Sequence, residues 1–587
     1  METWWDRYPD SLESEKNALN AAGYKWQIDE AAFSNGRLVL DVDVQHSDET
    51  LKVTAEYPDT FPYFPPNVIY PGKLLPRHHN PVGGNLCLLA REGEDWIPGT
   101  DTLAGLLSEQ LPKILAVNDS DATPEYVSSS EDHIGEPISS FLRYAPNAAI
   151  VVPDETPPDT IETGKFHLKL LEYPEHGLRG QTNPSVRGMV ACITDMKGST
   201  LVNAHAQPPT FTSTHNGYWI RLPERPDLKE APKLASHLFE QFKEQVPEAM
   251  KHLGAGKRGQ LFFIGFIWPD EQSWRTTSDD WVFLGIKVTQ QRKKSRPARF
   301  DLWLIRADWG GENAWMQRAP ALRPIRNKRA LLIGLGAIGS PVAINLSKAG
   351  IGHLDLVDHD HVQIGNTIRW SLGWNSVGLS KVAALASYLA AEYPYTKACG
   401  YECRIGAPAA PAEDFFSDYE LIRSKMKDAE IIIDATANYR VSHFLADLAK
   451  EMSKPYLWLT STHGGAGGVV GRIQPGITKG CWHCFQHRLG DESIRLPADS
   501  GGDAIQAAGC SQATFISAGI DSDEIALLAS RLAVATLCTD EVDGYPDFNW
   551  DIAVADLNRG GISLAPEWST YSLDRHTDCD TCEPNKE

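Results

Sequence analysis

The chain has 587 residues, which is too long for one hydrophobic core and indicates three or four domains. Hydrophobic residues make up 42% of it and charged residues 22%, as in ordinary globular proteins. The formal net charge of −22 argues against a general nucleic-acid binder and against a protein that binds anionic membranes.

The N-terminal sequence METWWDRYPD lacks the basic and apolar regions of a signal peptide. No apolar run approaches the ~18 residues that span a membrane. We therefore expect a cytoplasmic protein with no membrane partner. Its ten cysteines should be reduced, metal-bound or reactive rather than paired in disulfides.

Residues 1–150 have the pattern of an α+β domain. A polar helix is expected at Ser11–Ala22, followed by alternating strands at Leu38–Val44 and Leu51–Glu56. The prolines of FPYFPP at 61–66 cannot donate to a sheet ladder, so they mark the end of strand structure. The amphipathic run Leu103–Val117 is expected to form a second helix.

Cys87 follows Gly83-Gly84-Asn85 and precedes Trp96-Ile97-Pro98, so its thiol is expected in an accessible loop; the alternative is a small buried hydrophobe. The order of helix, meander, prolines, His/Asn/Pro cluster, cysteine loop, Trp-x-Pro and helix resembles ubiquitin-conjugating enzymes. The resemblance implies that Cys87 carries a thioester and that Asn80 supports the oxyanion when a lysine attacks. The family order is His-Pro-Asn, whereas this chain has His79-Asn80-Pro81. His78 and His79 are expected to be structural or to orient the substrate.

Residues 151–325 are expected to form a middle α+β linker domain. Polar, proline-rich sequence around residues 128–158 indicates a boundary before it. Strands are expected at 165–171, 186–193, 260–267, 281–289 and 300–305, and a helix at 234–242. We find no catalytic constellation here, and the domain is interpreted as a spacer between two catalytic parts.

A βαβ unit begins the C-terminal part. The apolar run Ala330–Ile333 ends in Gly334-x-Gly336-x-x-Gly339, and a helical pattern and a second strand ending at Asp358 follow. Such glycines let backbone N–H groups approach phosphate at a helix N-terminus, and the acidic residue after the second strand binds a ribose hydroxyl. Alone, this pattern suits a nicotinamide dehydrogenase equally well.

The residues after Asp358 favour a different chemistry. Asp360, Asn366, Arg369 and Lys381 follow in quick succession. Cations beside the phosphates serve attack on an α-phosphate, because they neutralise charge on phosphoryl oxygens, whereas hydride transfer has no use for them. This block resembles the adenylation domain of ubiquitin-activating enzymes and of their bacterial relatives in thiamine and molybdenum-cofactor biosynthesis. The resemblance implies a Rossmann-like domain at 326–587 with a mainly parallel sheet, and ATP and Mg²⁺ as cofactors.

The magnesium ligand is left open by the sequence. A strand at Glu430–Ile433 ends in Asp434, and the position where the adenylating family carries an aspartate is Ala437. Asp434 or Asp360 would supply the carboxylate, or the nucleotide itself would hold most of the metal. Asp434 could also simply cap the strand end.

Cys481-x-x-Cys484 and Cys579-x-x-Cys582 have the spacing of a structural zinc site. A redox pair is the alternative, and His483 could replace one ligand. Between the pairs, Cys510 follows the Gly/Ala/Ser-rich stretch 499–509 and precedes a helix expected at 523–537. A lone cysteine there is a good nucleophile, and its position is similar to that of the acyl- or sulfur-accepting cysteine of the family.

An activating part after a conjugating part resembles the fusion proteins of bacterial CBASS antiphage operons. The resemblance implies that a partner protein, in that system a cGAS-like nucleotidyltransferase, donates its C-terminal carboxylate. The carboxylate would become an acyl-adenylate, then a thioester at Cys510 and at Cys87, and finally an isopeptide bond to a lysine-bearing acceptor. A homodimer is also expected by family. Two alternatives remain: an adenylyltransferase for a sulfur carrier, and a non-catalytic scaffold, which Ala437 favours.

Overall fold

The computed structural model describes residues 3–46, 49–89, 95–118, 135–171, 186–204, 206–227, 233–273, 276–290, 297–407, 418–497 and 517–582. The chain divides into two compact units, Met1–Ala204 with Ser213–Trp309, and His205–Thr212 with Gly310–Glu587. This division lies before the boundary expected at 325/326. The reason is that Leu322 and Ile325 pack into the core of the C-terminal sheet.

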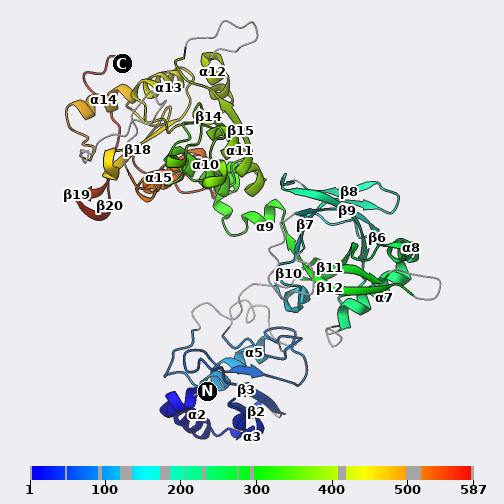
Figure 1. The fold of residues 1–587 in the computed structure, drawn as a ribbon. Helices are drawn as coiled ribbons and strands as arrows, with labels where there is room; N and C mark the ends of the chain where they lie inside the picture. The colour runs from blue at the N-terminus through cyan, green and yellow to red at the C-terminus, as the bar shows by residue number, and fades with distance from the viewer. Residues whose placement is uncertain are drawn as a thin grey trace. The chain divides into compact units, whose positions relative to one another are not determined.

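The N-terminal unit begins with an antiparallel sheet between helices (Figure 1). Its strands run in the order β1 (Lys25–Ile28), β2 (Val39–His46), β3 (Glu49–Glu56) and β4 (Asn67–Ile69). The helices are α1 (Trp4–Arg7), α2 (Pro9–Ala21), α3 (Glu30–Ser34), α4 (Leu103–Gly105), η1 (Leu106–Gln110) and α5 (Leu111–Val117). The two helices and two strands expected from the sequence are present, and α4, η1 and α5 continue one another.

One buried carboxylate joins helix α2 to the start of α4. Glu15 of α2 accepts hydrogen bonds through Oε2 from the Tyr57 hydroxyl at 2.6 Å and from the backbone N–H of Leu103 at 3.0 Å. Burial raises the pKa of Glu15, although both hydrogen bonds act in the opposite direction. The start of α4 is therefore bound to α2 by the Glu15 carboxylate, whose burial disfavours its charged form.

The same unit continues with an eight-stranded sheet in the order β5-β12-β11-β10-β9-β6-β7-β8. Because β5 also pairs with β7, seven of these strands close into a ring with β8 outside it. The strands are β5 (Ala149–Val152), β6 (Thr163–Leu171), β7 (Arg187–Asp195), β8 (Thr200–Asn203), β9 (Phe211–Arg221), β10 (Leu261–Ser273), β11 (Thr276–Gln290) and β12 (Arg299–Trp309). The short helix η2 (Ile138–Phe141) leads into β5.

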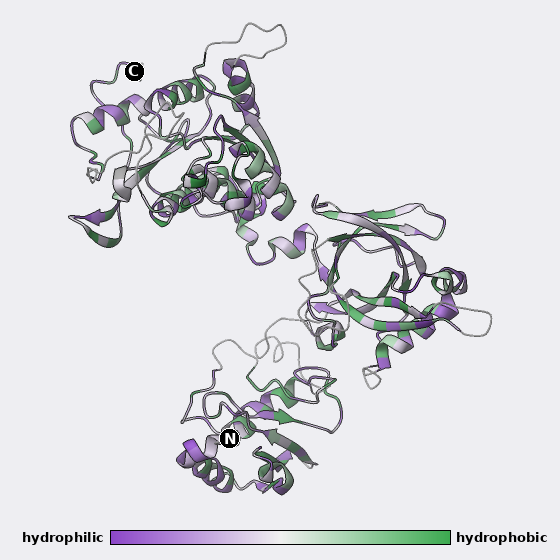
Figure 2. Cartoon of the chain, viewed as in Figure 1, coloured by the Kyte–Doolittle hydropathy of each residue, from purple (hydrophilic) through white to green (hydrophobic). Residues whose placement is uncertain are grey.

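Both faces of this ring are apolar cores. The interior is filled by large buried side chains, among them Phe166, Trp219 and Trp281. On the outside, α7 (Leu234–Gln245) and α8 (Pro247–Ala255) cover the sheet, and Figure 2 shows hydrophobic residues along these strands and on one part of α7. The strands and the helix expected in this region are therefore present, but their closure into a ring was not foreseen.

The C-terminal unit contains an eight-stranded sheet in the order β15-β14-β13-β16-β17-β18-β19-β20. The strands from β15 to β17 are parallel to one another, and β18, β19 and β20 continue the sheet as an antiparallel extension. Their bounds are β13 (Arg329–Ile333), β14 (His353–Asp358), β15 (Lys397–Glu402), β16 (Ile431–Asp434), β17 (Tyr456–Ser461), β18 (Gly467–Ile473), β19 (Ile552–Arg559) and β20 (Ile562–Tyr571). The expected parallel core is thus confirmed.

Helices cover both faces of this sheet. One face packs against α10 (Gly339–Ala349), α11 (Lys381–Glu392) and α15 (Gly519–Leu537), and the other against α12 (Asp418–Asp428), α13 (Tyr439–Glu451) and α14 (Trp482–Gly490). This double cover explains why β13 and β16 are almost continuously apolar. The helices α9 (Glu312–Met316) and η4 (Pro320–Asn327) precede β13, and η5 (Ile364–Asn366), η6 (Trp374–Ser376) and η7 (His463–Gly465) lie in loops. Among the described helices, none is both long and apolar enough to cross a bilayer.

Candidate functional site

The glycine turn between β13 and α10 uses its three glycines differently. Gly334 has φ 88°, and a Cβ there would lie 2.7 Å from the backbone that follows β16. A Cβ at Gly339 would lie 1.9 Å from the carbonyl oxygen of Gly334. A Cβ at Gly336 would meet no described atom within 4 Å. The first and third glycines therefore allow close packing, and the second borders open space in which a phosphate could approach the helix N-terminus.

Asp358 at the end of β14 is tied to this turn. Its Oδ2 accepts a hydrogen bond from the backbone N–H of Leu335 at 2.6 Å, and its Oδ1 accepts one from the N–H of Asp360 at 2.8 Å. The side chain of Trp370 also reaches the turn, where Nε1 donates to the Leu335 carbonyl at 2.6 Å. Asp358 therefore shapes the turn in this structure, and its role toward a ribose stays a prediction.

Lys381 and Asp360 form an ion pair beside the turn. Lys381 Nζ lies 2.9 Å from Asp360 Oδ2, with 11% of the lysine side chain and 53% of the aspartate side chain exposed. Burial acts to raise the pKa of Asp360, but the hydrogen bond and charge of Lys381 lower it below the usual value. Lys381 starts α11, directly after the N-cap Ser380. A nucleotide phosphate would have to compete with Asp360 for this cation.

Arg369 and Asn366 lie in the loop between Asp360 and Lys381. The Asn366 side-chain oxygen accepts a hydrogen bond from Gln363 N–H at 2.9 Å, and its carbonyl accepts one from Arg369 N–H at 3.0 Å. Burial lowers the pKa of the Arg369 guanidinium. Asn366 therefore stabilises the loop that carries Arg369, and Trp370 fastens that loop to the glycine turn. Sequence reasoning missed Trp370, because one tryptophan in a mixed loop gives no signal.

Asp434 is used inside the fold. Its Oδ1 accepts hydrogen bonds from Thr436 N–H at 2.9 Å and from the Thr436 hydroxyl at 2.6 Å. Its Oδ2 accepts from the hydroxyls of Ser442 at 2.6 Å and Tyr456 at 2.8 Å. These four bonds fit the expected alternative in which Asp434 caps the strand end. The carboxylate of Asp360 is far more exposed than that of Asp434, which is buried. Ala437 has φ 50° in the turn that follows β16.

Cys87 is exposed in the N-terminal unit, and its N–H donates to the carbonyl of His78 at 2.9 Å. Partial burial of the thiol and the nearby carboxylate of Glu136 raise the pKa of Cys87. The Asn80 side-chain oxygen accepts from Val82 N–H and Gly83 N–H, each at 2.9 Å, so it shapes the turn before the cysteine. These bonds do not test the oxyanion role of Asn80.

His79 is a structural residue of this loop, in line with the expectation. Its Nδ1 accepts a hydrogen bond from Leu75 N–H at 3.0 Å, and its Nε2 lies 3.1 Å from the Gly84 carbonyl. Burial lowers the pKa of His79, which favours the neutral ring that can make both contacts. His79 thus connects the glycine-rich turn at Gly84 to the backbone at Leu75.

Cys510 lies outside the described residues. The described chain resumes at residue 517 and enters α15 at Gly519. A Cβ at Gly519 would lie 3.0 Å from both Arg369 Cα and the Ile368 carbonyl oxygen. The start of α15 therefore lies against the loop that carries Arg369.

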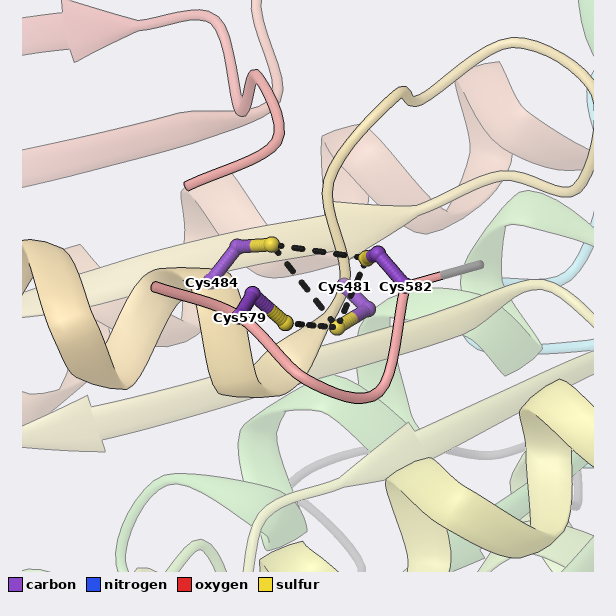
Figure 3. Close-up of side chains that lie close together, drawn as sticks. All are labelled: Cys481, Cys484, Cys579 and Cys582. Carbon is purple, nitrogen blue, oxygen red and sulfur yellow. Dashed lines mark hydrogen bonds between the residues drawn. The ribbon is translucent and has the colours of Figure 1, made fainter. Parts of the chain in front are cut away.

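The four cysteines of the two Cys-x-x-Cys pairs lie together (Figure 3). Cys481 and Cys484 come from the start of α14, and Cys579 and Cys582 from the C-terminal segment. Four sulfur–sulfur distances within the cluster run from 3.4 to 3.9 Å, and none of the four cysteines forms a disulfide. Four thiolates around tetrahedral zinc, at Zn–S of about 2.3 Å, lie about 3.8 Å apart. The cluster therefore fits a zinc ion.

His483 does not join this cluster. Its Nε2 lies 3.0 Å from Asp447 Oδ1 of α13, and its ring lies edge-on to His443. The cluster receives instead a backbone contact, because His576 N–H points at the Cys484 sulfur at 3.3 Å. Hydrogen bonds from backbone N–H groups to sulfur are favourable to the thiolate form.

A family model and two known proteins match part of the chain. Residues 313–542 match the ThiF family. The ATP-dependent ubiquitin transferase-like protein Cap2 of Enterobacter hormaechei is 26% identical to this chain over 280 residues. The alignment covers 42% of this chain and 45% of Cap2. The probable adenylyltransferase/sulfurtransferase MoeZ of Mycobacterium tuberculosis is 31% identical over 162 residues, which is 27% of this chain and 36% of MoeZ. The chain therefore contains a ThiF-type, E1-like adenylation domain.

One further similarity extends along nearly the whole chain. The uncharacterized protein y4oA of Sinorhizobium fredii is 26% identical over 595 residues, covering 99% of this chain and 97% of y4oA. Among solved structures, the crystal structure of E. coli MccB with ATP aligns with a TM-score of 0.32 and 16% identity, covering 45% of this chain and 69% of that chain. The similarity to y4oA shows that the N-terminal and middle parts occur together with the adenylation domain elsewhere.

Proposed function

We propose that this protein joins a partner protein's C-terminus to a lysine by ATP-dependent activation and two thioester steps. The observation that carries this proposal is the set of groups around the Gly334–Gly339 turn, in a segment that matches the ThiF family. A free carboxylate is a poor electrophile. Attack on the α-phosphate of ATP would turn it into a mixed anhydride, the acyl-adenylate, with release of pyrophosphate.

The residues of the turn would take separate roles in this step. The phosphates would lie over Gly336 at the N-terminus of α10, and Asp358 would bind the ribose. Lys381 and Arg369 would stabilise the negative charge that develops on the phosphoryl oxygens. Mg²⁺ would bind Asp360 and the nucleotide oxygens, because carboxylate and phosphate oxygens are the ligands it prefers. Lys381 would then exchange its bond to Asp360 for one to phosphate.

Cys510 would take the acyl group from the adenylate as a thioester, and Cys87 would receive it by thiol exchange. Support for the first step is that Gly519, which follows Cys510 closely in the sequence, lies against the backbone of Arg369. Support for the second is that Cys87 is exposed in a glycine-rich turn of a domain with a helix, a four-stranded meander and a C-terminal helix. Attack by a lysine on the second thioester would give the isopeptide bond.

The biological setting that we propose is CBASS antiphage defence. The match to Cap2 over 42% of the chain supports it. The carboxylate donor would then be a cGAS-like nucleotidyltransferase, and the enzyme would act as a homodimer. Zinc at Cys481, Cys484, Cys579 and Cys582 would be structural, because four thiolates leave no open coordination position.

A second candidate function is adenylation of a sulfur-carrier protein, which the similarity to MoeZ favours. The two functions differ in what they demand of Cys87. Protein ligation requires the Cys87 thiol, whereas sulfur-carrier adenylation leaves this residue without a task. A scaffold without activity would neither bind ATP productively nor form a thioester.

The deciding experiment is ATP–pyrophosphate exchange with the proteins encoded beside this one, followed by non-reducing electrophoresis. We expect exchange that depends on one of these proteins, and a thiol-sensitive adduct that is lost in Cys87→Ala. Exchange without any adduct on Cys87 would favour the sulfur-carrier reading. Absence of ATP–pyrophosphate exchange with every neighbour, in the parent and in Arg369→Ala alike, would favour a scaffold.

A further inference from the structure

The segment that leads into the middle part is anchored on β10. A Cβ at Gly135 would lie 2.6 Å from the β10 backbone, so only glycine can approach this closely. Three residues later, the backbone N–H of Ile138 donates to the buried carboxylate of Asp270 at 2.9 Å. The backbone at Glu136 is therefore held between two contacts with β10.

That side chain reaches the loop of Cys87. Glu136 Oε1 accepts a hydrogen bond from His78 N–H at 3.0 Å and lies 4.0 Å from His78 Nδ1. The carbonyl of the same histidine accepts the N–H of Cys87 at 2.9 Å. His78 has φ 55°, a strained conformation that these contacts on both of its peptide groups help to hold. One residue, His78, thus joins the Glu136 carboxylate to Cys87 through its two peptide groups.

A second tie runs in parallel. Arg77 and Glu271 form an ion pair whose side chains are only 10% and 23% exposed. Arg77 is also held by Asn118, whose side-chain oxygen accepts the Arg77 N–H at 2.8 Å. Two carboxylates therefore bind the loop before Cys87. Glu136 contacts His78 and lies near the thiol, and Glu271 pairs with Arg77.

The charge of Glu136 has the wrong sign for activating the thiol. A carboxylate next to a cysteine disfavours the thiolate, whereas nucleophilic cysteines are activated by positive surroundings. The situation changes once the sulfur is acylated. A thioester is neutral, so the negative charge of Glu136 does not destabilise it. The attacking lysine arrives as an ammonium ion, which a carboxylate attracts and can deprotonate.

We infer that the segment leading into the middle part completes the Cys87 site by supplying Glu136 as the proton acceptor for the attacking lysine. This inference rests on the proposed thioester at Cys87. The lysine ammonium gives one proton to the Glu136 carboxylate, and the free amine attacks the thioester carbonyl. The C–S bond breaks, the C–N bond remains, and a second nitrogen proton passes to the departing Cys87 sulfur. Glu136 then releases its proton to water.

The test uses the full chain in a Cys510→Ala background and needs no natural partner. Cys87 is acylated with the 2-mercaptoethanesulfonate thioester of a short peptide that ends in Gly-Gly, and the adduct is located by peptide mass mapping. The loaded protein is then treated with free lysine or with hydroxylamine. Hydroxylamine is neutral near pH 7 and needs no proton acceptor, so it reports on access to the thioester and on the integrity of the loop.

We expect Glu136→Gln to slow release to lysine about 100-fold, which is typical of a lost general base, while release to hydroxylamine changes less than about twofold. Glu136→Asp keeps the carboxylate and should retain part of the lysine reaction. Glu271→Gln is the matched control, because it removes an equal charge from the neighbouring tie; its ratio of lysine to hydroxylamine rates should equal that of the parent.

Two results would overturn the inference. One is an unchanged ratio of lysine to hydroxylamine rates in Glu136→Gln, and the other is an equal loss with both nucleophiles, which would mean that Glu136 only holds the loop. A parent protein whose Cys87 takes no acyl group, although iodoacetamide alkylates that residue, would remove the proposed thioester itself. The failure of the proposed function would thereby be distinguished from a failure that concerns Glu136 alone.

Discussion

Lys381 and Asp360 are joined twice, through their side chains at 2.9 Å and through the bond from Lys381 N–H to the Asp360 carbonyl, also 2.9 Å. These two contacts close the base of the loop that carries Asn366 and Arg369. The end of β14 and the start of α11 are thereby held at the glycine turn. The two contacts thus stabilise the loop and hold the Lys381 ammonium group beside the turn where the phosphates are expected.

Replacing Lys381 by Ala should abolish most of the adenylation chemistry. Loss of one positive group that stabilises phosphoryl oxygens typically costs about 100-fold or more in rate. ATP–pyrophosphate exchange with the natural partner is the measurement. Lys397→Ala, which removes an exposed lysine at the start of β15, is the matched control and should exchange like the parent. Equal rates in both variants would show that Lys381 serves the fold alone.

The roles of the second and third glycines of the turn can be separated by two small substitutions. Gly339→Ala should prevent folding of the C-terminal unit, because its Cβ would meet the Gly334 carbonyl oxygen at 1.9 Å. Gly336→Ala should fold normally, since its Cβ meets no described atom within 4 Å, but should weaken ATP binding by blocking the phosphate. Circular dichroism and titration with ATP provide the measurements. A Gly336→Ala protein that binds ATP like the parent would place the nucleotide elsewhere.

Purified protein should contain about one zinc ion per chain. Cys579→Ser combined with Cys582→Ser should lose the metal and several kcal/mol of stability, because structural zinc contributes directly to folding. Metal analysis and thermal unfolding with and without a chelator are the measurements. Cys192→Ser, in a strand of the other unit, should keep its zinc. Metal-free parent protein with an unaltered unfolding temperature would contradict the zinc site.

The unit from β13 through α10 to β14 was predictable because its signals are local. A buried run, three glycines and a helical period follow one another within thirty residues of sequence, and the acidic residue ends the second strand. The Cys-x-x-Cys pairs were predictable for a different reason. Two separate pairs of soft ligands have few uses other than a shared metal, so their meeting could be expected without knowing the fold between them.

Contacts between distant segments could not be predicted. The saturation of Asp434 depends on Tyr456, which comes from β17, and on Ser442 from α13. The position of Glu136 depends on the hydrogen bond between its neighbour Ile138 and Asp270. These two residues are 132 positions apart in the sequence. A glutamate in a polar linker has no pattern that distinguishes it from solvated neighbours. The closure of the middle ring likewise rests on the non-local pairing of β5 with β7.

The stability of the N-terminal helices should depend on pH through Glu15. Burial raises the pKa of Glu15 in the folded state above its unfolded value. The folded state is therefore relatively stabilised as the pH falls through the raised pKa, down to the unfolded pKa, and this contribution is lost as the pH rises. Hydrogen exchange of the α2 backbone, corrected for its intrinsic pH dependence, should show slower opening at pH 5 than at pH 7.

Glu15→Gln should remove this pH dependence, because an amide oxygen can still accept from Tyr57 and Leu103 but does not titrate. Glu15→Ala should lose about 2–3 kcal/mol, since two buried donors would be left without an acceptor. Glu13→Gln on the exposed face of the same helix is the control and should retain the parent profile. A Glu15→Gln protein that opens with the parent's pH dependence would assign the titration to another group.

The order of the two thiols can be established with single substitutions. In Cys510→Ala, adenylate formation measured by ATP–pyrophosphate exchange should persist, while the adduct on Cys87 should vanish, because the acyl group would have no route from the phosphate to the second sulfur. Cys87→Ser should instead trap the partner as an oxygen ester that resists thiols and yields to mild base. Non-reducing electrophoresis with mass spectrometry distinguishes these adducts. Normal loading of Cys87 in the Cys510→Ala protein would refute the relay and would mean that Cys87 attacks the adenylate directly.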